Sequence, residues 1–376
     1  MQPVGFRINP TFSFTLLGTF AIYLWTRPRL SEWLWVLPIA AAMRVAFAAT
    51  MGGFGGYFAV AWISWGTFLG LATLVVLAVQ ALRTSAERRR TYTRTFYAGS
   101  IFPLLAMVTG YFIPLNLWLR PTVFDPFLFR LDGALGFQPS FVLGRLLATR
   151  PVAWGWTTVI YYALPLSGGI LYASHRLQHR QQVQILPLLI SFILVGFALY
   201  SIFPAVGPAH VFPNLYPWTT PSATDVALEP IANTSDPRNC MPSLHFGAAL
   251  LVWWNSRSWP GWGRTLAASF LIATAFSTLA LGEHYVADLV VAFPFTLAFQ
   301  AAWTTSLPRR SKQRYIPLLI GVVLWGVWLV LARYAVPIFE KSLLGTWLAM
   351  LVTISVSSLL KARLAGSAKK TLAEGI

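Results

Sequence analysis

Long apolar runs recur along the whole chain and constrain its fold more than any other feature of the sequence. Runs of roughly 18 to 25 residues are long enough to cross the hydrocarbon core of a bilayer, which is about 30 Å thick. Of the 376 residues, 56% are hydrophobic and only 10% are charged. That composition leaves too little polar surface to cover a soluble core of this size. The sequence therefore predicts an all-α, polytopic membrane protein.

We predict about eleven transmembrane helices, with ends uncertain by several residues because apolar length does not define a boundary. The predicted spans are Thr11–Trp25, Trp33–Thr50, Phe58–Leu82, Phe96–Leu119, Val152–Ser174, Val183–Phe203, Pro242–Asn255, Thr265–Leu281, His284–Leu307, Tyr315–Val336 and Leu343–Leu360.

The distribution of basic residues predicts how the helices are oriented in the membrane. The net charge of +17 could indicate nucleic acid, but the arginines and lysines lie in short loops between apolar runs. One set of alternate loops carries the clusters at 83–94, 309–314 and 361–370, whereas the other set has scattered cations such as Arg7 and Lys341. Cytoplasmic loops are the ones enriched in Arg and Lys. This bias predicts an external N-terminus and a cytoplasmic C-terminus, and it argues against a nucleic-acid partner.

The same orientation gathers several segments on the external face. The loops before Pro242 and His284 both emerge there, and so does the segment 120–150. That segment mixes apolar and charged residues, which is typical of one or two helices lying flat in the membrane interface. The proline-rich stretch 204–241 is predicted to be a long loop over the same face.

Two short motifs bring scarce polar groups to the edges of apolar helices. The first is Asn-Cys-Met-Pro-Ser-Leu-His-Phe-Gly, residues 239–247. Proline suits the first turn of a helix, so Pro242 would leave the amides of Ser243 and Leu244 pointing outward. Such a helix end binds anions, and here Ser243 adds a hydroxyl donor and His245 an imidazole.

The second motif runs from Ser277 to Asp288 and contains His284. Residues four apart share a helix face, so Asp288 is expected to hold one ring nitrogen of His284 and leave the other nucleophilic. Together the motifs predict phosphoryl transfer: His284 attacks phosphorus, Asp288 orients it, His245 protonates the departing alkoxide, and Ser243 binds the phosphate oxygens. Singly, each histidine is often a packing residue and the serine often a cap, but the joint pattern is much more specific.

The two motifs resemble the second and third signature motifs of the type 2 phosphatidic acid phosphatase superfamily. "NCMPSLHFG" and "EHYVAD" are similar to its inositol-phosphotransferase branch, the aureobasidin-resistance or inositol phosphorylceramide synthase type. The resemblance implies a six-helix catalytic core at 96–307, three accessory helices at 1–95, and two accessory helices with a cytoplasmic tail at 308–376. It also implies the same roles for His284, Asp288 and His245, with no metal and no cofactor.

The sequence departs from that superfamily in two informative ways. Its first motif requires a lysine, and every lysine here lies after residue 311. Thr278 stands where the third motif usually has arginine. Losing two cations weakens a site for a phosphomonoester more than one for a singly charged phosphodiester. The departures favour the phosphotransferase branch, with Arg120 and Arg238 as the candidates to replace the lost charge on phosphate.

Other polar residues have weaker interpretations. His210 is a minor candidate for the phosphate site, and Asp125 and Asp132 are interpreted as helix caps, Asp125 preceding Pro126 at a predicted helix start. Arg44 falls near the middle of a predicted span, where a charge suggests function. A water-filled groove or a shifted helix boundary explains it equally well. Cys240 is the only cysteine, so neither a disulfide framework nor a thiolate cluster is expected.

These observations predict a membrane phosphotransferase that moves an inositol-phosphate-type head group from a lipid donor to a lipid alcohol through a phosphohistidine. The expected location is the plasma (inner) membrane, with the site on the external, periplasmic or lumenal face. A lipid phosphate phosphatase acting on phosphatidic acid or a polyprenyl pyrophosphate is the alternative. A lipid transporter is less favoured because transporters usually place polar groups at mid-bilayer.

Overall fold

The computed structural model describes residues 10–51, 61–176 and 182–373 of the chain. The protein is mostly helical, at 76%. Within the described residues, six helices are long and apolar enough to cross a membrane. The all-α membrane architecture is therefore supported, but the count of about eleven spans is not. Arg7 and the start of the third predicted span, at Phe58, lie outside the described residues.

The chain forms two compact units. The first comprises residues 1–108 and 162–179, and the second comprises residues 109–161 and 180–376. The elements of the first unit are α1 (Pro10–Trp25), α2 (Leu30–Trp33), α3 (Val36–Met51), α4 (Ala61–Arg83), most of α5 (Ala86–Leu119) and α9 (Leu164–Arg176). Those of the second are the end of α5, β1 (Thr122–Val123), α6 (Asp125–Gly133), α7 (Pro139–Ala148), α8 (Pro151–Tyr162), α10 (Ile185–Leu199), α11 (Pro208–Val211), η2 (Ala223–Asp225), β2 (Ile231–Ala232), α12 (Leu244–Asn255), η3 (Ser256–Ser258), α13 (Gly261–Ala280), α14 (Val286–Ala302), α15 (Lys312–Tyr334), α16 (Val336–Phe339) and α17 (Leu343–Ala373).

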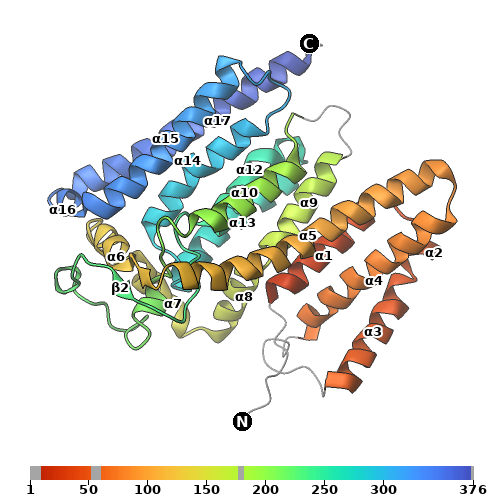
Figure 1. Cartoon of the computed structure of the whole chain (residues 1–376), viewed down its shortest axis with the longest axis horizontal. Helices are drawn as coiled ribbons and strands as arrows, with labels where there is room; N and C mark the ends of the chain where they lie inside the picture. The colour runs from red at the N-terminus through yellow and green to blue at the C-terminus, as the bar shows by residue number, and fades with distance from the viewer. Residues whose placement is uncertain (1–9, 52–60, 177–181, 374–376) are drawn as a thin grey trace. The chain divides into compact units, whose positions relative to one another are not determined.

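The first unit is built around α1, which packs against α4 and α9 (Figure 1). Gly18 and Gly169 allow the close approach of α1 and α9, because a Cβ on Gly169 would lie 2.9 Å from the Cα of Gly18. Arg44 on α3 does not stand alone in an apolar layer: its guanidinium lies 4.8 Å from the ring centre of Trp65 on α4. A cation over an aromatic face is stabilised there, which accounts for this charge without a catalytic role.

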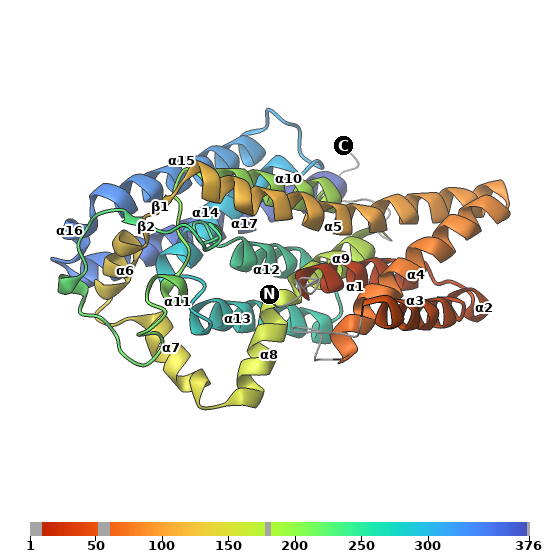
Figure 2. The same ribbon diagram turned by 60° about the horizontal axis from the view of Figure 1, so that its bottom comes forward.

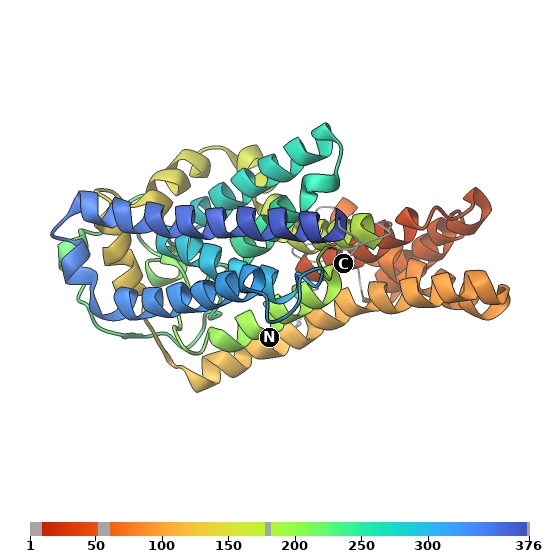
Figure 3. The ribbon, with the colours of Figure 1, turned by 90° about the horizontal axis from the view of Figure 1, so that it is seen from above.

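Helix α14 is the centre of the second unit. It packs against α15, α17, α12 and α10 (Figure 1). Nearly every side of α14 is buried, as expected for a helix that is apolar all round. On α15, Gly321 permits the close approach, because a Cβ there would lie 2.7 Å from the carbonyl oxygen of Pro294. Figure 3 shows α15 and α17 running side by side, joined through the short α16.

Several short elements gather at one end of the long helices of the second unit. Figure 2 shows α6, α11, β1 and β2 together at this end. The two strands pair antiparallel, with Thr122 opposite Ala232. This pairing ties the segment 120–150 to the loop 204–241, so the two stretches predicted for one face do lie together. The predicted interfacial segment contains two helices, α6 and α7.

Several helix boundaries differ from the prediction, and three of them have a clear local cause or bear on the site. The expected span Val152–Ser174 is interrupted at Ala163, and α9 starts afresh with Pro165 in its first turn. Proline lacks the N–H that an interior helical position needs, so it favours a new start. Helix α5 begins ten residues earlier than predicted, because polar residues 86–95 continue the helix beyond its apolar part. Helix α14 begins at Val286 rather than at His284.

Candidate active site

His284 lies in the turn that joins α13 to α14. Helix α13 ends at Ala280, and Gly282 turns the chain with a φ of 72°, a conformation that glycine adopts without steric cost. The sequence predicted that His284 and Asp288 share one helix. In the structure His284 precedes α14, whereas Asp288 lies within it. The two side chains still meet: His284 Nδ1 lies 3.4 Å from Asp288 Oδ2, and both residues are fully buried.

The carboxylate of Asp288 is fixed by two further donors. Its Oδ2 accepts from the backbone N–H of Tyr285 at 2.8 Å and from the thiol of Cys240 at 2.7 Å. Because Nδ1 of His284 faces this carboxylate, Nε2 is the ring nitrogen directed elsewhere. Burial lowers the pKa of His284 to about 4, which leaves the imidazole neutral near pH 7. A neutral, oriented imidazole is the form that acts as a nucleophile.

Ser243 meets Nε2 of His284. Its hydroxyl oxygen lies 3.2 Å from that nitrogen, and it also accepts from the backbone N–H of Phe246 at 3.2 Å. Ser243 is thus the N-cap of α12, which is a preferred position for serine. The cap fixes the hydroxyl beside the nitrogen that we expect to react.

The start of α12 differs from the sequence prediction by two residues. The helix begins at Leu244, so Pro242 lies just outside it and Ser243 takes the cap position. The N–H of Ser243 donates to the carbonyl of Asp288 at 3.3 Å. That amide was predicted to point outward at an anion, and it is instead used to join α12 to α14.

His245 forms the other wall of the site. Its ring stacks on that of Tyr161, with centroids 3.9 Å apart and planes 19° from parallel. The centroid of His245 lies 6.0 Å from that of His284. Nδ1 of His245 is buried and has no hydrogen-bond partner among the described residues, while the residue as a whole is partly exposed. The structure therefore brings together four predicted residues, Ser243, His245, His284 and Asp288.

Asp132 supports the site from a different helix. Its carboxylate accepts from the N–H of Val286 at 2.8 Å and of Ala287 at 3.2 Å, which are the first two residues of α14. It thus acts as a cap supplied from α6, where a negative group is also favoured by the helix dipole. Burial raises the pKa of Asp132 to about 8, although the backbone donors oppose that shift. The cap prediction is confirmed, but for a helix remote in sequence.

Asp125 ties the loop 204–241 to the same turn. Its carboxylate accepts from the N–H groups of Val206 and Gly207 and from the hydroxyl of Tyr285 at 3.1 Å. The prediction that Asp125 is an N-cap was wrong: Phe124 takes that position, and Asp125 is the first residue of α6. Burial raises the pKa of Asp125 to about 6, against the effect of its three donors.

A backbone contact completes this support. The N–H of Ala209 donates to the carbonyl of Gly282 at 3.0 Å. Gly207 has a φ of 99°, and a Cβ there would lie 2.6 Å from the carbonyl oxygens of Gly282 and Glu283. Only a glycine with this backbone conformation allows the loop 204–241 to approach the His284 turn so closely.

A charged cluster lies beside His284 and was not predicted as a unit. His210 lies between two carboxylates, with Nδ1 3.2 Å from Asp236 and Nε2 3.4 Å from Glu283. Burial opposes protonation of His210, but the two carboxylates outweigh it and raise its pKa to about 9. Burial likewise opposes ionisation of Glu283, whereas His210 and the nearby histidines hold its pKa below the ordinary value. The position of Glu283 next to His284 in the sequence was the available signal.

Arg238 is not available to bind phosphate. It is fully buried, and its Nε, Nη1 and Nη2 atoms donate to the carbonyls of Arg120, Asn233 and Asp236 and to the Asn233 side chain. These bonds occupy all five N–H donors of a guanidinium. Arg238 instead fastens the loop 204–241 to the end of α5, an arrangement that does not favour the predicted phosphate contact.

Arg120 and Thr278 also differ from the expected arrangement. Arg120 donates from Nε to the carbonyl of Ser201 at 2.8 Å and lines a pocket whose walls do not include the site histidines. Thr278 is fully buried, and its carbonyl accepts from the N–H of His284 at 3.2 Å. At this position the chain supports the histidine through its backbone and supplies no cation.

Three groups of the site have the chemistry of metal ligands. One ligand atom each from Cys240, His284 and Asp288 lies within 4.8 Å of the others, and all three residues are buried. The thiol of Cys240 and the ring of His284 both contact Asp288 directly. The thiol donates a hydrogen bond to Asp288, whereas Nδ1 of His284 lies 3.4 Å from the carboxylate without forming one. The expected independence from metals stays a prediction.

The part of the chain that holds this site is similar to a known protein family. The family model described as PAP2 superfamily matches residues 126–302, a range that includes His245, His284 and Asp288. No curated protein and no solved structure matches the chain. Members of the PAP2 superfamily are phosphatases and phosphotransferases, and the match is consistent with an enzyme of this type. Together with the six apolar helices, the match also indicates a membrane protein.

Proposed function

We propose that the protein transfers a phosphoryl head group of the inositol-phosphate type between membrane lipids through a phosphohistidine on His284. The observation that carries this proposal is the contact set of one ring: Nδ1 of His284 lies 3.4 Å from Asp288, and Nε2 lies 3.2 Å from Ser243. One ring nitrogen is thus oriented by a carboxylate, and the other is beside a hydroxyl suited to phosphate.

In the first step, Nε2 of His284 attacks the phosphorus of the donor lipid. A P–N bond forms, and the P–O bond to the donor's lipid alcohol breaks. His245 gives a proton to the departing alkoxide. Burial and the neighbouring His284 lower the pKa of His245 to about 3 in the free protein, so this step requires the anionic phosphate to stabilise the imidazolium. Asp288 stabilises the positive charge that develops on His284. A centroid separation of 6.0 Å between the two rings is compatible with both contacting one phosphoryl group.

In the second step, the hydroxyl of an acceptor lipid attacks the phosphohistidine. Its proton passes to His245, a P–O bond forms and the P–N bond breaks. Both histidines return to their starting protonation states. Water in place of the lipid hydroxyl would make the same site a phosphatase, which is the alternative function.

Transfer is favoured over hydrolysis by the charge of the site. Arg238 is committed to the loop, Arg120 lines another pocket, and the chain has no lysine before residue 312. The groups that contact His284 are neutral or acidic, so a singly charged phosphodiester suits them better than a dianionic phosphomonoester. Ser243 is the phosphate-binding side chain that the geometry supports.

The site is proposed to face the external side of the plasma membrane, with the C-terminus in the cytoplasm. Helix α17 has 31 residues and is a candidate span, which corresponds to a length of about 46 Å. It begins beside α16, which packs against α6 at the end of the unit that holds the site. A helix of this length that starts at the end holding the site would end on the other side of the membrane, which supports placing the site and the C-terminus on opposite sides. The enrichment of Arg and Lys in one set of loops supports a cytoplasmic C-terminus.

The proposal is tested by supplying purified protein with three substrate sets: phosphatidic acid, a polyprenyl pyrophosphate, and phosphatidylinositol with ceramide. We expect a phosphoinositol-containing lipid product from the third set. Free phosphate from the first two sets alone would overturn the transferase function and leave the phosphatase. His284→Ala should abolish either activity, whereas His284→Ala with full activity would overturn the mechanism.

The contact between Ser243 and His284 raises a second mechanism, in which the serine is the nucleophile and the histidine its base. The two are separated by trapping the intermediate with a ³²P-labelled donor. A phosphohistidine is labile in acid, whereas a phosphoserine survives it. Ser243→Ala should reduce the rate and still accumulate acid-labile label; acid-stable label in the wild type would assign the nucleophile to Ser243.

A further inference from the structure

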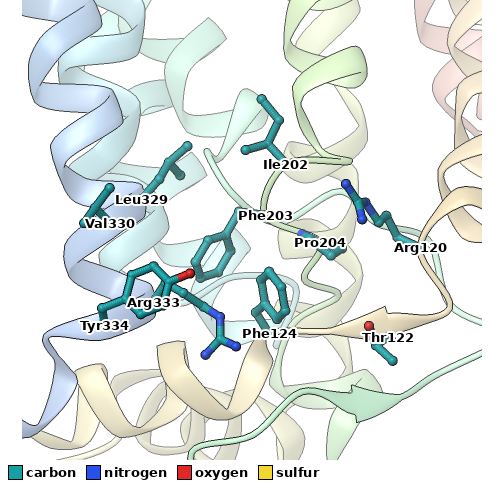
Figure 4. A pocket seen from close by; sticks show the side chains of 10 residues that line it. All are labelled: Arg120, Thr122, Phe124, Ile202, Phe203, Pro204, Leu329, Val330, Arg333 and Tyr334. Carbon is teal, nitrogen blue, oxygen red and sulfur yellow. The ribbon is translucent and has the colours of Figure 1, made fainter.

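A second polar site lies outside the catalytic centre, where α5, α10 and α15 end. It is a pocket of about 340 Å³ that combines two arginines with an apolar wall (Figure 4). Its lining residues are Arg120, Thr122, Phe124, Ile202, Phe203, Pro204, Leu329, Val330, Arg333 and Tyr334. None of the proposed catalytic residues is among them.

The two arginines give the pocket a positive charge that no acid balances. Among the described residues, neither Arg120 nor Arg333 forms an ion pair with a carboxylate. The Nε of Arg120 is held by the carbonyl of Ser201 at 2.8 Å, which leaves its Nη groups as donors. The guanidinium of Arg333 lies over the rings of Phe124 and Phe127, at 4.9 and 4.1 Å from their centres. A guanidinium held this way presents its edge N–H groups to an anion.

The position of the pocket indicates where its ligand comes from. Arg120 follows directly after α5, and Arg333 lies in the last turn of α15, and both helices are candidate membrane spans. The arginines therefore lie at the level where an apolar span ends and lipid head groups begin. Ile202 and Val330 are 51% and 58% exposed and continue the pocket as an apolar surface toward the spans.

Arginines at helix ends are often mobile anchors that extend toward head groups. Two features distinguish this pair. Both guanidinium groups are held by specific contacts, one by a carbonyl and the other by two aromatic rings. Both arginines also line one pocket. Positioned donors that share a cavity lower the cost of ordering on binding, which a mobile anchor does not.

We propose that this pocket binds one anionic phospholipid, with the phosphate between Arg120 and Arg333 and an acyl chain along Ile202 and Val330. The site is not catalytic, and the proposal does not depend on the function proposed above. Its wall nevertheless adjoins the catalytic turn, because Phe124 precedes Asp125, whose carboxylate holds Gly207 and Tyr285. A bound lipid would stabilise the position of Phe124 and, through the chain, of Asp125.

The test uses full-length protein in detergent, titrated with short-chain phosphatidylglycerol or phosphatidylcholine, with bound lipid counted by native mass spectrometry. We expect selective binding of phosphatidylglycerol, weakened about tenfold or more by Arg333→Gln and further by Arg120→Gln with Arg333→Gln, since each loses charge-assisted bonds. Arg145→Gln, at an exposed arginine of α7 outside the pocket, is the matched control. His284→Ala should keep the binding, because the catalytic centre is separate.

Equal binding of the two lipids by the wild type, or equal loss in the Arg145→Gln control, would overturn the proposal. A third arm adds inorganic phosphate in excess over the lipid. If free phosphate displaces the lipid, the pocket recognises a free anion and the lipid assignment is wrong. Arg333→Lys separates charge from geometry: it keeps the charge but loses the planar stacking, and intermediate affinity is expected from it.

Discussion

At the scale of single residues, the site depends on buried groups that never touch the substrate. Cys240 is a clear case, because a weak thiol donor points at the carboxylate that orients the nucleophile. The side chain is fully buried, so its effect is transmitted through Asp288. It is a positioning residue in the mechanism proposed here.

We expect Cys240→Ala to lower kcat severalfold with little change in KM, because Asp288 loses one of its two donors while substrate contacts are kept. Cys240→Ser retains a donor and should recover most of the loss. Steady-state kinetics of the two variants provide the measurement, with thermal stability recorded in parallel. If Cys240→Ala and Cys240→Ser lower kcat equally, Cys240 contributes through packing and not through its hydrogen bond.

Asp132 is expected to matter more, because its carboxylate holds two backbone N–H groups at the start of α14. The two N–H groups donate to different oxygens of Asp132, and Asp132→Asn replaces one of these oxygens by an NH2 group that cannot accept. About 1–3 kcal/mol of stability should be lost. Turnover should fall as well, since these residues set the position of His284 relative to Asp288. Chemical denaturation and turnover measure the two effects. Asp225→Asn, at an exposed carboxylate of the external loop, is the control.

At the scale of elements, the loop 204–241 is fastened to the site by charge as well as by backbone contacts. Burial lowers the pKa of His210 in this loop, but Asp236 and Glu283 raise it by more, to about 9. For a histidine whose folded pKa exceeds the ordinary 6.5, the stabilisation is complete below about pH 6.5 and disappears as the pH rises through about 9. The lowered pKa values of Asp236 and Glu283 keep the acidic partners ionised throughout this range.

Hydrogen exchange tests this attachment. Between pH 6 and 7, amides of residues 204–215 should exchange more slowly in the wild type than in His210→Gln, by a factor equivalent to about 1 kcal/mol or less for groups a quarter exposed. The ratio of the two rates should approach one above pH 9. A ratio that does not change with pH would show that the charges of the cluster do not hold the loop.

At the scale of the whole molecule, the sequence predicted which polar residues lie together better than it predicted the number and ends of the helices. Ser243, His245, His284 and Asp288 were recognised because each motif is local, and the structure brings them together. Asp132 was not recognised as a site residue, because its bond to Val286 joins positions 154 apart in the chain. Local periodicity carries no record of such a contact.

The predicted count of about eleven spans was not confirmed, for a related reason. Apolar length alone does not separate a membrane span from a short helix surrounded by other helices. Helices α10, α12 and α14 have 15, 12 and 17 residues and all were predicted as spans. None of them is among the six that are long and apolar enough by themselves. These helices pack against other helices of the second unit, and the sequence alone does not predict that packing.

The orientation of the second unit can be tested on one helix, because α13 leads directly from one end of the unit into the catalytic turn. It has 20 residues, or about 30 Å, and is a candidate span. A cysteine at Gly261, where a Cβ meets nothing within 4 Å, should therefore lie across the membrane from one at Ser222 in the external loop. Cys240 is fully buried and should not react in either background. With a membrane-impermeant maleimide on sealed vesicles of known orientation, Ser222→Cys should be labelled from the external side and Gly261→Cys only after permeabilisation. Labelling of both from one side would mean that α13 does not cross the bilayer, and labelling in the reverse order would place the catalytic turn in the cytoplasm.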